Sequence, residues 1–503
     1  MNTMKELLDH AADSYGDYDS VQYIENEGNV IHKSYRNLRE DSEKVAGYLQ
    51  FLGYRREKIA IVSPNSYEWM VAFFGIILSG NIVIPIDHRL PMDNIHEILN
   101  KAEVRVCIYH KKLKELAEKV RVEVASIEEL ICINDYGVLA EKVPENGITE
   151  YDADGEACCM IMFTSGTTGA SKGVMLSQKG LLVDAESASS QSDNRHKVTH
   201  VVSILPMFHI FALAVDILWS VVQGFTLYLA NTIPEVVQYS KTFGATRICM
   251  VPMMADYIYH CLVSFATKHP EMPRRKAAEE ILGEKIHYLV FGGAYLEPEF
   301  RKNLMEFGLE IRCGYGMTET SCVIATEEGV EGKSGSVGRI LDCNEVKIVD
   351  GEIWVRGENI MLGYYQDDDS TQEILKDGWI MTGDIGYVDE EHYLFIVGKK
   401  KNVIITASGE NVSPEELEKK LLAYDMIKET IVYQKKNQII AEIYPNYEKT
   451  ALDKDEQNQH MQKIIDEINA ANPAYKHIQG WTIRDTEFEK TGTMKIKREN
   501  YYY

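Results

Sequence analysis

The sequence lacks any apolar run long enough to cross a membrane. A membrane-spanning helix needs about 20 mostly apolar residues in succession. The most apolar long stretch, residues 69–86, is interrupted by polar residues, glycines and a proline, among them Ser79, Gly80 and Asn81. We therefore predict a buried helix that turns at these three residues into a strand at 82–85, and no integral membrane segment.

Disulfide and leader motifs are also lacking. The nine cysteines are odd in number and none stands in a C-x-x-C spacing, which indicates reduced thiols in a cytoplasmic protein rather than a disulfide framework. The first ten residues have no basic region followed by an apolar core, so we expect no secretory signal peptide.

An excess of positive charge is absent as well. The formal net charge is −24, which argues against nucleic acid as the main partner. Residues 399–503 carry as many basic as acidic side chains, so the whole excess of acid lies before residue 399. This shift predicts a boundary near that position, with anionic ligands held on its C-terminal side.

What the chain does contain is the pattern of an α/β protein. Up to about residue 390, helical patterns alternate with short strands, which predicts parallel sheets with helical crossovers in a large N-terminal domain. Within residues 335–397, strands joined by tight turns predict an antiparallel, β-barrel-like part. The residues after 399 are predicted to form a compact α+β domain, whose first helix follows a capping box of Ser413 and Glu416.

Residues 164–173 form the most informative segment. They hold five hydroxyl side chains, three glycines and Lys172, so backbone N–H groups, hydroxyls and a positive charge can surround anionic oxygens. An apolar strand at 157–163 leads into the segment, as expected for a ligand-binding loop at the end of a sheet strand. The lysine has no glycine directly before it, so this is not a Walker A loop. We interpret it as a phosphate-binding loop, the alternative being a flexible turn.

Four further segments follow in order. Residues 291–294 place paired glycines after a strand, where a flat ring can lie on the backbone. Residues 314–319 hold an aromatic ring, a hydroxyl and a carboxylate. Residues 378–384 present one carboxylate on a turn, and residues 489–498 place a lysine in a tight turn. Each alone is typical of an ordinary turn, but the order of all five segments is specific.

In this order the segments resemble those of the adenylate-forming superfamily, which includes acyl-CoA synthetases, nonribosomal peptide adenylation domains and luciferases. The resemblance covers essentially the whole chain. It implies an N-terminal domain of residues 1–398 and a small mobile C-terminal domain of residues 399–503, with a hinge near Lys401. It also implies two steps: a carboxylate attacks the α-phosphate of Mg-ATP to give acyl-adenylate and pyrophosphate, and a thiol then takes the acyl group.

The resemblance also implies roles for individual residues. The β- and γ-phosphates of ATP would be held by Thr164, Ser165, Gly166, Thr167, Thr168, Gly169 and Lys172. Thr318 would contact the α-phosphate, Glu319 would bind Mg²⁺, and Asp384 would accept the ribose hydroxyls. Lys495 would bridge the attacking carboxylate and the α-phosphate. Adenine would lie between two short groups of residues: Gly292, Gly293 and Ala294, and Gly314, Tyr315 and Gly316.

Three positions are compared with the family pattern. Lys399 stands where an arginine usually contacts the ribose, which keeps the charge and loses the bidentate fork. Met494 replaces the usual glycine before the catalytic lysine, whereas Lys401 is a residue that the hinge position carries in the family. The first two departures leave open a catalytically silent binding protein.

Residues 206–213 bear on which acid is bound. Family members that activate amino acids carry an aspartate there for the substrate ammonium, whereas this segment holds no carboxylate and Asp216 comes six residues after Ile210. A buried ammonium without a partner is costly. A fatty or other hydrophobic carboxylic acid is therefore favoured, with an aryl acid as an alternative. His209 would line or gate the acyl pocket, unless it is an ordinary core histidine.

The loop at 406–414 bears on the thiol. It resembles the loop that CoA ligases of the family bring to the active site, where Gly409 would flank a pantetheine tunnel. Pantetheine belongs to CoA and also to the phosphopantetheine arm of acyl carrier proteins, so both acceptors stay open. We expect CoA first. A carrier protein would dock on the neutral C-terminal lobe, because the acidic body would repel an acidic carrier.

Overall fold

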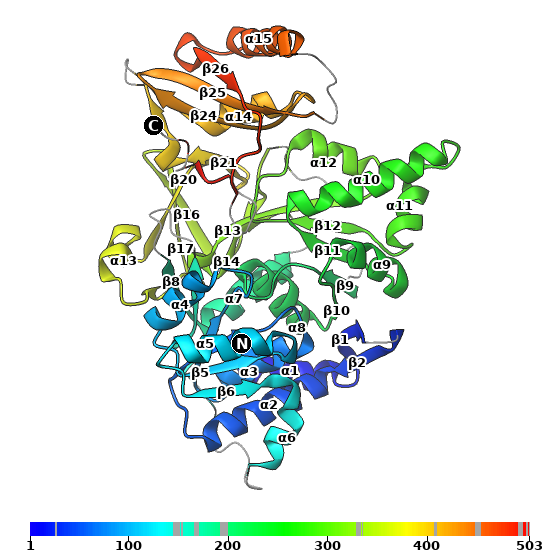
Figure 1. Ribbon diagram of the computed structural model, residues 1–503, viewed down its shortest axis with the longest axis vertical. Coiled ribbons are helices and arrows are strands. Elements are labelled where there is room, and N and C mark those ends of the chain that lie inside the picture. Colours follow the sequence, from blue (N-terminus) through cyan, green and yellow to red (C-terminus); the bar gives the residue numbers. More distant parts are fainter. Residues whose placement is uncertain are drawn as a thin grey trace.

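The structure of the protein is a computed structural model (Figure 1). It describes residues 1–25, 28–143, 151, 154–164, 171–191, 200–327, 333, 335–406, 410–447, 454–490, 496–498 and 501. Two largely parallel sheets and an antiparallel sheet make up the body, and a small C-terminal sheet lies at the top of the view. This mixed α/β architecture confirms the predicted fold class.

The first parallel sheet has the strand order β18-β8-β7-β4-β3-β5-β6. Its strands are β3 (Lys58–Val62), β4 (Ile82–Pro85), β5 (Val106–Tyr109), β6 (Glu129–Cys132), β7 (Cys158–Thr164), β8 (Lys172–Ser177) and β18 (Gly363–Tyr364). Strands β7 and β8 form an antiparallel pair, so the predicted phosphate loop connects two strands of this sheet.

The apolar stretch 69–86 lies in the core of this sheet. Helix α3 (Tyr67–Leu78) buries all but one of its side chains, because it is covered by α2 (Tyr35–Phe51) and by the strands that flank it. The chain turns at Ser79 into β4, which confirms the prediction of a buried helix and a strand. None of the described helices is both long and apolar enough to span a membrane.

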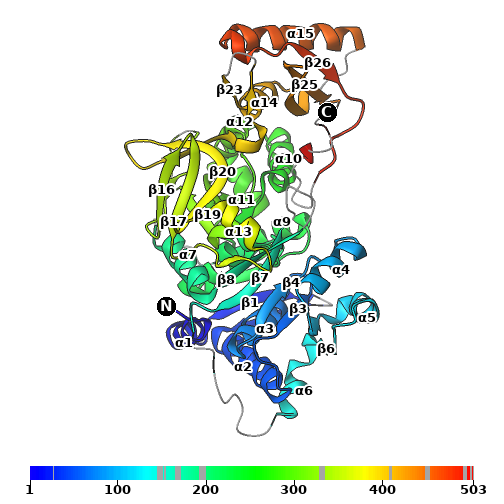
Figure 2. The same cartoon turned by 90° about the vertical axis from the view of Figure 1, so that its left-hand side faces the viewer.

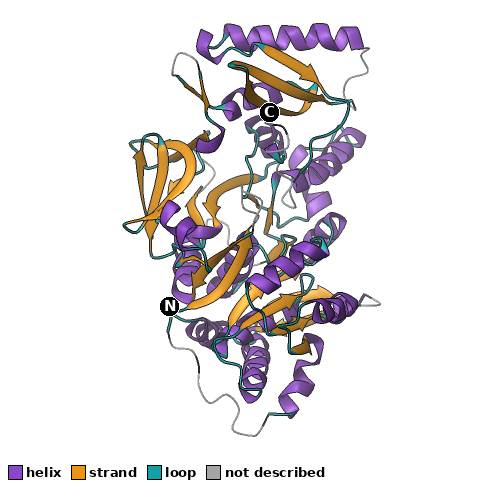
Figure 3. Cartoon of the chain, turned by 60° about the vertical axis from the view of Figure 1, so that its left-hand side comes forward, coloured by secondary structure: helices purple, strands orange, loops and turns teal. Residues whose placement is uncertain are grey.

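The second sheet has the order β15-β14-β13-β12-β11-β9-β10-β1-β2. Its strands are β1 (Asp19–Ile24), β2 (Val30–Ser34), β9 (His200–Ser203), β10 (Thr226–Leu229), β11 (Arg247–Met250), β12 (Tyr288–Phe291), β13 (Glu310–Met317), β14 (Cys322–Thr326) and β15 (Arg339–Ile340). Figure 3 shows helices on both sides of the parallel sheets. This is the layering that parallel strands need in order to bury both of their faces.

Helices of the body connect and cover these strands. Those not yet named are α1 (Met4–Tyr15), α4 (Met92–Lys101), α5 (Lys114–Glu123), α6 (Tyr136–Glu141), α7 (Gln178–Gln191), α8 (Trp219–Gln223), α9 (Ile233–Phe243), α10 (Pro252–Lys268), α11 (Arg274–Leu282), α12 (Pro298–Met305) and α13 (Asp368–Ile374). A π-helical segment, Ala212–Leu218, leads directly into α8.

The third sheet is antiparallel, as predicted for residues 335–397. It comprises β16 (Asn344–Val349), β17 (Glu352–Gly357), β19 (Leu375–Lys376), β20 (Trp379–Val388) and β21 (Leu394–Lys399). The pairing of β20 with β21 places Asp384 opposite Lys399. The register of this hairpin therefore brings together two residues that the sequence analysis assigned separately to the ribose.

The C-terminal residues build a small sheet of their own (Figure 2). Strands β24 (Ile427–Lys435), β25 (Gln438–Pro445) and β26 (Gly480–Ile483) pack with α14 (Pro414–Leu422) and α15 (Lys454–Ala470) around a separate apolar cluster. The short strands β22 (Ile404–Ile405) and β23 (Asn411–Val412) lie between this sheet and the antiparallel one in sequence.

The predicted capping box at α14 does not form. The helix begins at Pro414 after Ser413, as predicted, but the Ser413 side chain makes no capping hydrogen bond. Its hydroxyl donates instead to the carbonyl oxygen of Val397 (3.1 Å), and Glu416 pairs with Lys420 and Lys476. A cap is a local interaction of modest strength, and contacts with Val397 of β21, with Lys420 of the same helix and with Lys476 replace it.

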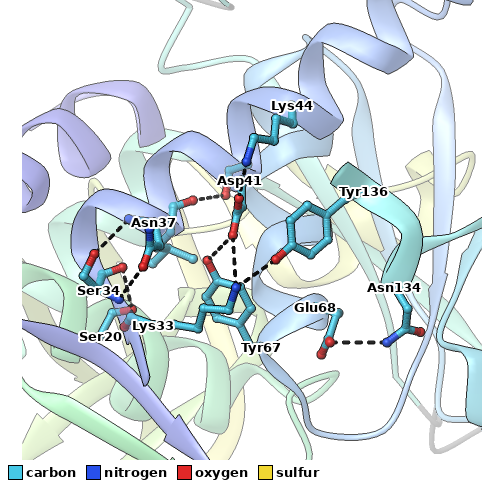
Figure 4. Close-up of polar contacts among 12 residues, drawn as sticks. Ser20, Lys33, Ser34, Asn37, Asp41, Lys44, Tyr67, Glu68, Asn134 and Tyr136 are labelled. Carbon is cyan, nitrogen blue, oxygen red and sulfur yellow. Dashed lines mark hydrogen bonds and ion pairs between the residues drawn. The ribbon is translucent and has the colours of Figure 1, made fainter. Parts of the chain in front are cut away.

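A buried polar cluster ties three helices together far along the chain from the predicted site (Figure 4). Asp41 on α2 accepts a hydrogen bond from the Tyr67 hydroxyl (2.9 Å) and pairs with Lys44 (2.7 Å). Lys33 donates to the Tyr136 hydroxyl (3.0 Å) and lies 3.7 Å from Asp41. Because the buried carboxylate is both paired and hydrogen-bonded, we interpret this cluster as structural.

Candidate active site

Residues of four predicted segments, and His209, meet at one cavity of about 1230 Å³. The strand ends of β7, β12, β13 and β21 open onto it, as expected for a ligand site in an α/β sheet, and β20 contributes Asp384 from its middle. The predicted residues that line it are Thr164, His209, Gly292, Gly293, Ala294, Gly314, Tyr315, Gly316, Thr318, Glu319, Asp384 and Lys399.

Other predicted residues lie elsewhere or outside the described part of the chain. Lys172 is absent from the cavity lining but stands opposite Thr164 in the β7–β8 pair. The residues outside the described ranges are Ser165, Gly166, Thr167, Thr168, Gly169, Gly409, Met494 and Lys495. Their assignments therefore stay predictions.

Asp384 is the centre of a charged group that lines the cavity. One carboxylate oxygen lies 2.7 Å from Lys399 Nζ, and the other accepts a hydrogen bond from the Tyr315 hydroxyl (2.6 Å). Burial, followed by the charge of Asp384, raises the pKa of Tyr315 well above its ordinary value, so the phenol keeps its proton and donates. The Asp384 side chain is fixed in place by two donors that project from different strands.

Glu319 is held by a tyrosine that the sequence analysis did not identify. The Tyr364 hydroxyl donates to Glu319 Oε1 (2.7 Å), and burial together with the Glu319 charge raises the pKa of this phenol. Lys172 Nζ lies 5.0 Å from the centre of the Tyr364 ring. Tyr364 on β18 therefore connects the base of the phosphate loop with the predicted Mg²⁺ ligand.

Two glycines of the site are required by close packing. A Cβ atom at Gly292 would come within 2.8 Å of the Phe211 ring, so the loop after β12 can lie against that ring only without a side chain. At Gly316 a Cβ atom would overlap the carbonyl oxygen of Cys322 at 1.5 Å. These glycines let β12 and β13 end directly at the cavity.

Many of the other residues that line the cavity are apolar. They include Met162, Ala188, Leu205, Pro206, Ile210, Ala212, Val215, Trp219, Val251, Met254, Val290 and Val323. Asp216 does not line the cavity: it is fully buried, accepts a hydrogen bond from the Ser203 hydroxyl (2.7 Å) and lies 3.8 Å from Arg247. The segment that would carry an ammonium-binding aspartate thus offers the cavity no carboxylate.

His209 lines the cavity as well. Burial is the main cause that lowers its pKa, and the nearby Arg89 charge acts in the same direction while Asp87 opposes it. The imidazole is therefore neutral at pH 7. The side chain faces a cavity, and its role at an acyl pocket stays a prediction.

Both parts of the chain line the cavity. Tyr295 and Arg301 contribute from the body, and Glu415 and Lys419 contribute from α14 of the C-terminal lobe. Lys419 Nζ lies 4.1 Å from the centre of the Tyr295 ring.

Comparison with known proteins decides the family. The model of the AMP-binding enzyme family matches residues 8–365, and the model of the AMP-binding enzyme C-terminal domain matches residues 401–503. The chain belongs to the AMP-binding enzyme family. It is an enzyme of the AMP-forming acid–CoA ligase group.

Named relatives of this AMP-binding enzyme act on different acids. A long-chain-fatty-acid–CoA ligase of Salmonella typhimurium is 28% identical over 480 residues, which cover 85% of this chain and 82% of the relative. A probable 4-coumarate–CoA ligase of Dictyostelium discoideum is 28% identical over 502 residues, which cover 91% of this chain and 88% of the relative.

Solved structures share the fold. An anthranilate CoA ligase in complex with anthranoyl-AMP matches with a TM-score of 0.83 at 20% identity, covering 99% of this chain and 96% of its own. A fatty acyl CoA synthetase of Mycobacterium tuberculosis matches with a TM-score of 0.73 at 21% identity, covering 100% of this chain and 98% of its own.

Proposed function

We propose that this AMP-binding enzyme uses Mg-ATP to convert a hydrophobic, fatty carboxylic acid into an acyl-adenylate, and then transfers the acyl group to the thiol of CoA. One observation carries the proposal. A single cavity is lined both by charged and hydroxyl side chains and by a large set of apolar side chains. We assign the two sets to opposite ends of the cavity, which suits the two halves of an acyl-adenylate.

At the polar end we assign the nucleotide. Asp384 would accept the ribose hydroxyls, with Lys399 beside it, and adenine would lie between residues 292–294 and Tyr315. Thr318 would contact the α-phosphate. Thr164 and Lys172, at the two ends of the loop that contains Ser165, Gly166, Thr167, Thr168 and Gly169, would hold the β- and γ-phosphates. Hydroxyls, backbone N–H groups and a lysine are the groups that bind phosphate.

The residues at this end also fit Mg²⁺. This cation is commonly bound by one or two carboxylates together with substrate phosphates, and Glu319 supplies one carboxylate beside Thr318. Within the described ranges, no three His, Cys, Asp or Glu side chains gather as a protein-only metal centre would need. When bound with ATP, Mg²⁺ would neutralise phosphate charge, and Tyr364 would keep the Glu319 carboxylate oriented.

The first chemical step needs two anions brought together. A carboxylate oxygen of the acid forms a bond to the α-phosphorus, and the bond from that phosphorus to the bridging oxygen of pyrophosphate breaks. Positioning and fixed positive charge lower such a barrier. We assign this charge to Lys495, between the carboxylate and the α-phosphate. The thiolate of the acceptor then attacks the acyl carbon, and AMP leaves.

Movement of the C-terminal lobe would separate the two steps. The lobe has its own sheet, which begins at Ile427, and its own apolar cluster, which begins at Ile404. The boundary after residue 398 and the hinge near Lys401 stay part of the proposal. Gly409 would reach the pantetheine tunnel when the lobe turns. CoA is the proposed acceptor, and an acyl carrier protein would use the same tunnel.

An aryl acid is the second candidate substrate. The likeness to the Dictyostelium 4-coumarate–CoA ligase over nearly the whole chain favours it. Both candidates share the absence of a carboxylate among the described apolar lining residues, so the difference between them lies in the shape of the apolar end.

The test measures pyrophosphate release by the purified protein with Mg-ATP and a panel of fatty and aryl acids. Each acid is assayed with CoA, with carrier protein and with neither acceptor. Turnover of fatty acids with CoA is expected. No turnover of any acid would mean a catalytically silent binding protein, and acylated carrier without acyl-CoA would replace CoA as the acceptor.

The Lys495→Ala variant tests the catalytic assignment in the same assay. It should lose adenylate formation and still form thioester from a supplied acyl-adenylate, because only the first step needs charge at the α-phosphate. A variant that makes adenylate at the wild-type rate would remove this assignment.

A further inference from the structure

The apolar end of the cavity is bounded by one helix. Ala212, Val215 and Trp219 line it. The first two lie in the π-helical turn Ala212–Leu218, and Trp219 begins α8 directly after that turn. The lining of the cavity by this helix ends at Trp219, which has the largest side chain of the three.

A buried arginine holds this tryptophan in place. The guanidinium carbon of Arg247 lies 4.3 Å from the centre of the Trp219 ring, and Arg247 is 2% exposed. Nη2 donates to the carbonyl oxygen of Val215 (2.7 Å), while Nε and Nη1 have no hydrogen-bond partner in the described part of the chain. The ring face therefore compensates part of a cation that is removed from water.

The same arginine fixes the segment that carries the wall. Its bond to the Val215 carbonyl lies within the π-helical turn, and Asp216 of that turn faces the guanidinium at 3.8 Å. The Phe225 ring lies farther from the guanidinium carbon, at 5.8 Å, so the indole is the nearer of its two ring contacts. Trp219 is thus a fixed wall rather than a movable gate.

We infer that Trp219 sets the maximum length of the acid, and that the enzyme prefers chains that end at the indole. This inference rests on the proposed function, since it assigns the apolar end to the acid. Acids longer than the cavity must bend or displace the indole, whereas shorter ones leave apolar surface unfilled. Trp219 is therefore a specificity-determining residue for the acid and takes no part in the adenylation chemistry.

The test compares kcat/KM for a series of saturated fatty acids in the wild type and in Trp219→Phe. Phenylalanine keeps an aromatic face for Arg247 and shortens the wall. The optimum should move to longer acids, with a gain of about fourfold for each further methylene that the enlarged cavity buries.

Ala188→Leu should shift the preferred chain length in the opposite direction. Ala188 lines the cavity from α7, and α7 packs on α8, where Gln223 Nε2 donates to Ser189 Oγ (3.1 Å). A larger side chain there should move the optimum to shorter acids. Trp379→Phe is the matched control: Arg356 stacks on Trp379 at 4.7 Å, but Trp379 does not line the cavity.

The possible outcomes distinguish the inference about Trp219 from the proposed function. A shift to longer acids in Trp219→Phe and to shorter acids in Ala188→Leu, with no shift in Trp379→Phe, supports the inference. If the wild type turns over fatty acids and the profile of folded Trp219→Phe is unchanged, the inference is overturned and the proposed function stands. If Trp219→Phe does not fold, the direction of the Ala188→Leu shift decides. If the wild type turns over no acid, both fail together.

Discussion

Two ion pairs flank the same cavity and differ in their access to water. At the polar end, Lys399 and Asp384 lie 2.7 Å apart, and the lysine side chain is 48% exposed. At the apolar end, Arg247 and Asp216 lie 3.8 Å apart, with exposures of 2% and 0%. The open pair can exchange one partner for a ligand hydroxyl, whereas the sealed pair can only hold the protein together. The comparison separates binding groups from structural ones.

Arg247→Leu should have the largest effect on stability. It leaves Asp216 buried without its cation, and breaking a buried ion pair costs about 3–5 kcal/mol of unfolding free energy. Denaturant unfolding measures this loss. Arg105→Leu is the matched control, since Arg105 pairs with Glu57 and Glu128 at the surface and should cost at most about 1 kcal/mol. Equal losses in the two variants would contradict the sealed role of Arg247.

A third carboxylate, that of Asp184, should make the unfolding free energy depend on pH. Asp184 on α7 is fully buried and accepts hydrogen bonds from the backbone N–H of Val323 (2.9 Å) and from Asn359 (3.1 Å). Burial raises its pKa to about 7, above its value in the unfolded chain. The folded state therefore binds more protons between about pH 4 and 7, and the unfolding free energy falls as the pH rises through this range.

Asp184→Asn should remove this fall. Each pKa unit corresponds to about 1.4 kcal/mol, so the contribution amounts to a few kcal/mol between pH 4 and pH 8. Melting temperatures of the wild type and the variant, measured across that range, should diverge with rising pH in favour of the variant. Glu418, whose burial also raises its pKa to about 7, is present in both proteins and cancels. If the melting temperatures of the two proteins change with pH in parallel, Asp184 does not have the raised pKa.

Asp384→Asn should affect nucleotide use and leave the fold nearly intact. The amide keeps the shape but loses the charge that attracts Lys399 and accepts from Tyr315. Hydrogen bonds to a charged group are worth about 1.5–3 kcal/mol, so kcat/KM for ATP should fall about 10- to 100-fold while the KM for the acid changes little. A variant that lost stability as Arg247→Leu does would erase the distinction between the two pairs.

Tyr364→Phe should have the smallest effect of the four. Without the hydroxyl, Glu319 loses a donor that orients it, and removing a partner of a metal ligand typically weakens metal binding about 10-fold or more. The Mg²⁺ concentration for half-maximal pyrophosphate release should rise accordingly. Tyr365→Phe serves as control, because the Tyr365 hydroxyl donates to Glu103 (3.2 Å) and accepts from Gln366 (3.2 Å), both of which are exposed residues. If Tyr364→Phe needs the same Mg²⁺ concentration as the wild type, the Tyr364 hydroxyl does not orient Glu319 for metal binding.

Sequence patterns located the polar end but not its internal contacts. Asp384 and Lys399 were assigned from the family pattern, yet their pairing depends on the register of β20 and β21. Tyr364 was missed because it stands on a two-residue strand, and only the sheet order brings it to Glu319. Motifs identify residue types, whereas contacts between distant segments arise from topology.

The apolar end was less accessible to sequence analysis. The position of Asp216 was correctly judged to be outside the ammonium-binding slot, but its partner Arg247 is 31 residues away in sequence and begins another strand. A π-helical turn has no periodicity of its own over a single turn, so nothing in the sequence indicated which residues of 212–219 face the cavity. The failed capping box at Ser413 has a similar cause, since a tertiary contact replaced a local one.

The central claim is that one cavity holds the nucleotide at one end and the acid at the other. Calorimetric binding of an acyl-sulfamoyl-adenosine, a stable mimic that joins a fatty tail to adenosine, tests it most directly. The account predicts binding at least about 100-fold tighter than that of AMP, because an analogue of the reaction intermediate occupies both ends at once. Binding no tighter than that of AMP would show that the apolar end does not receive the acyl chain.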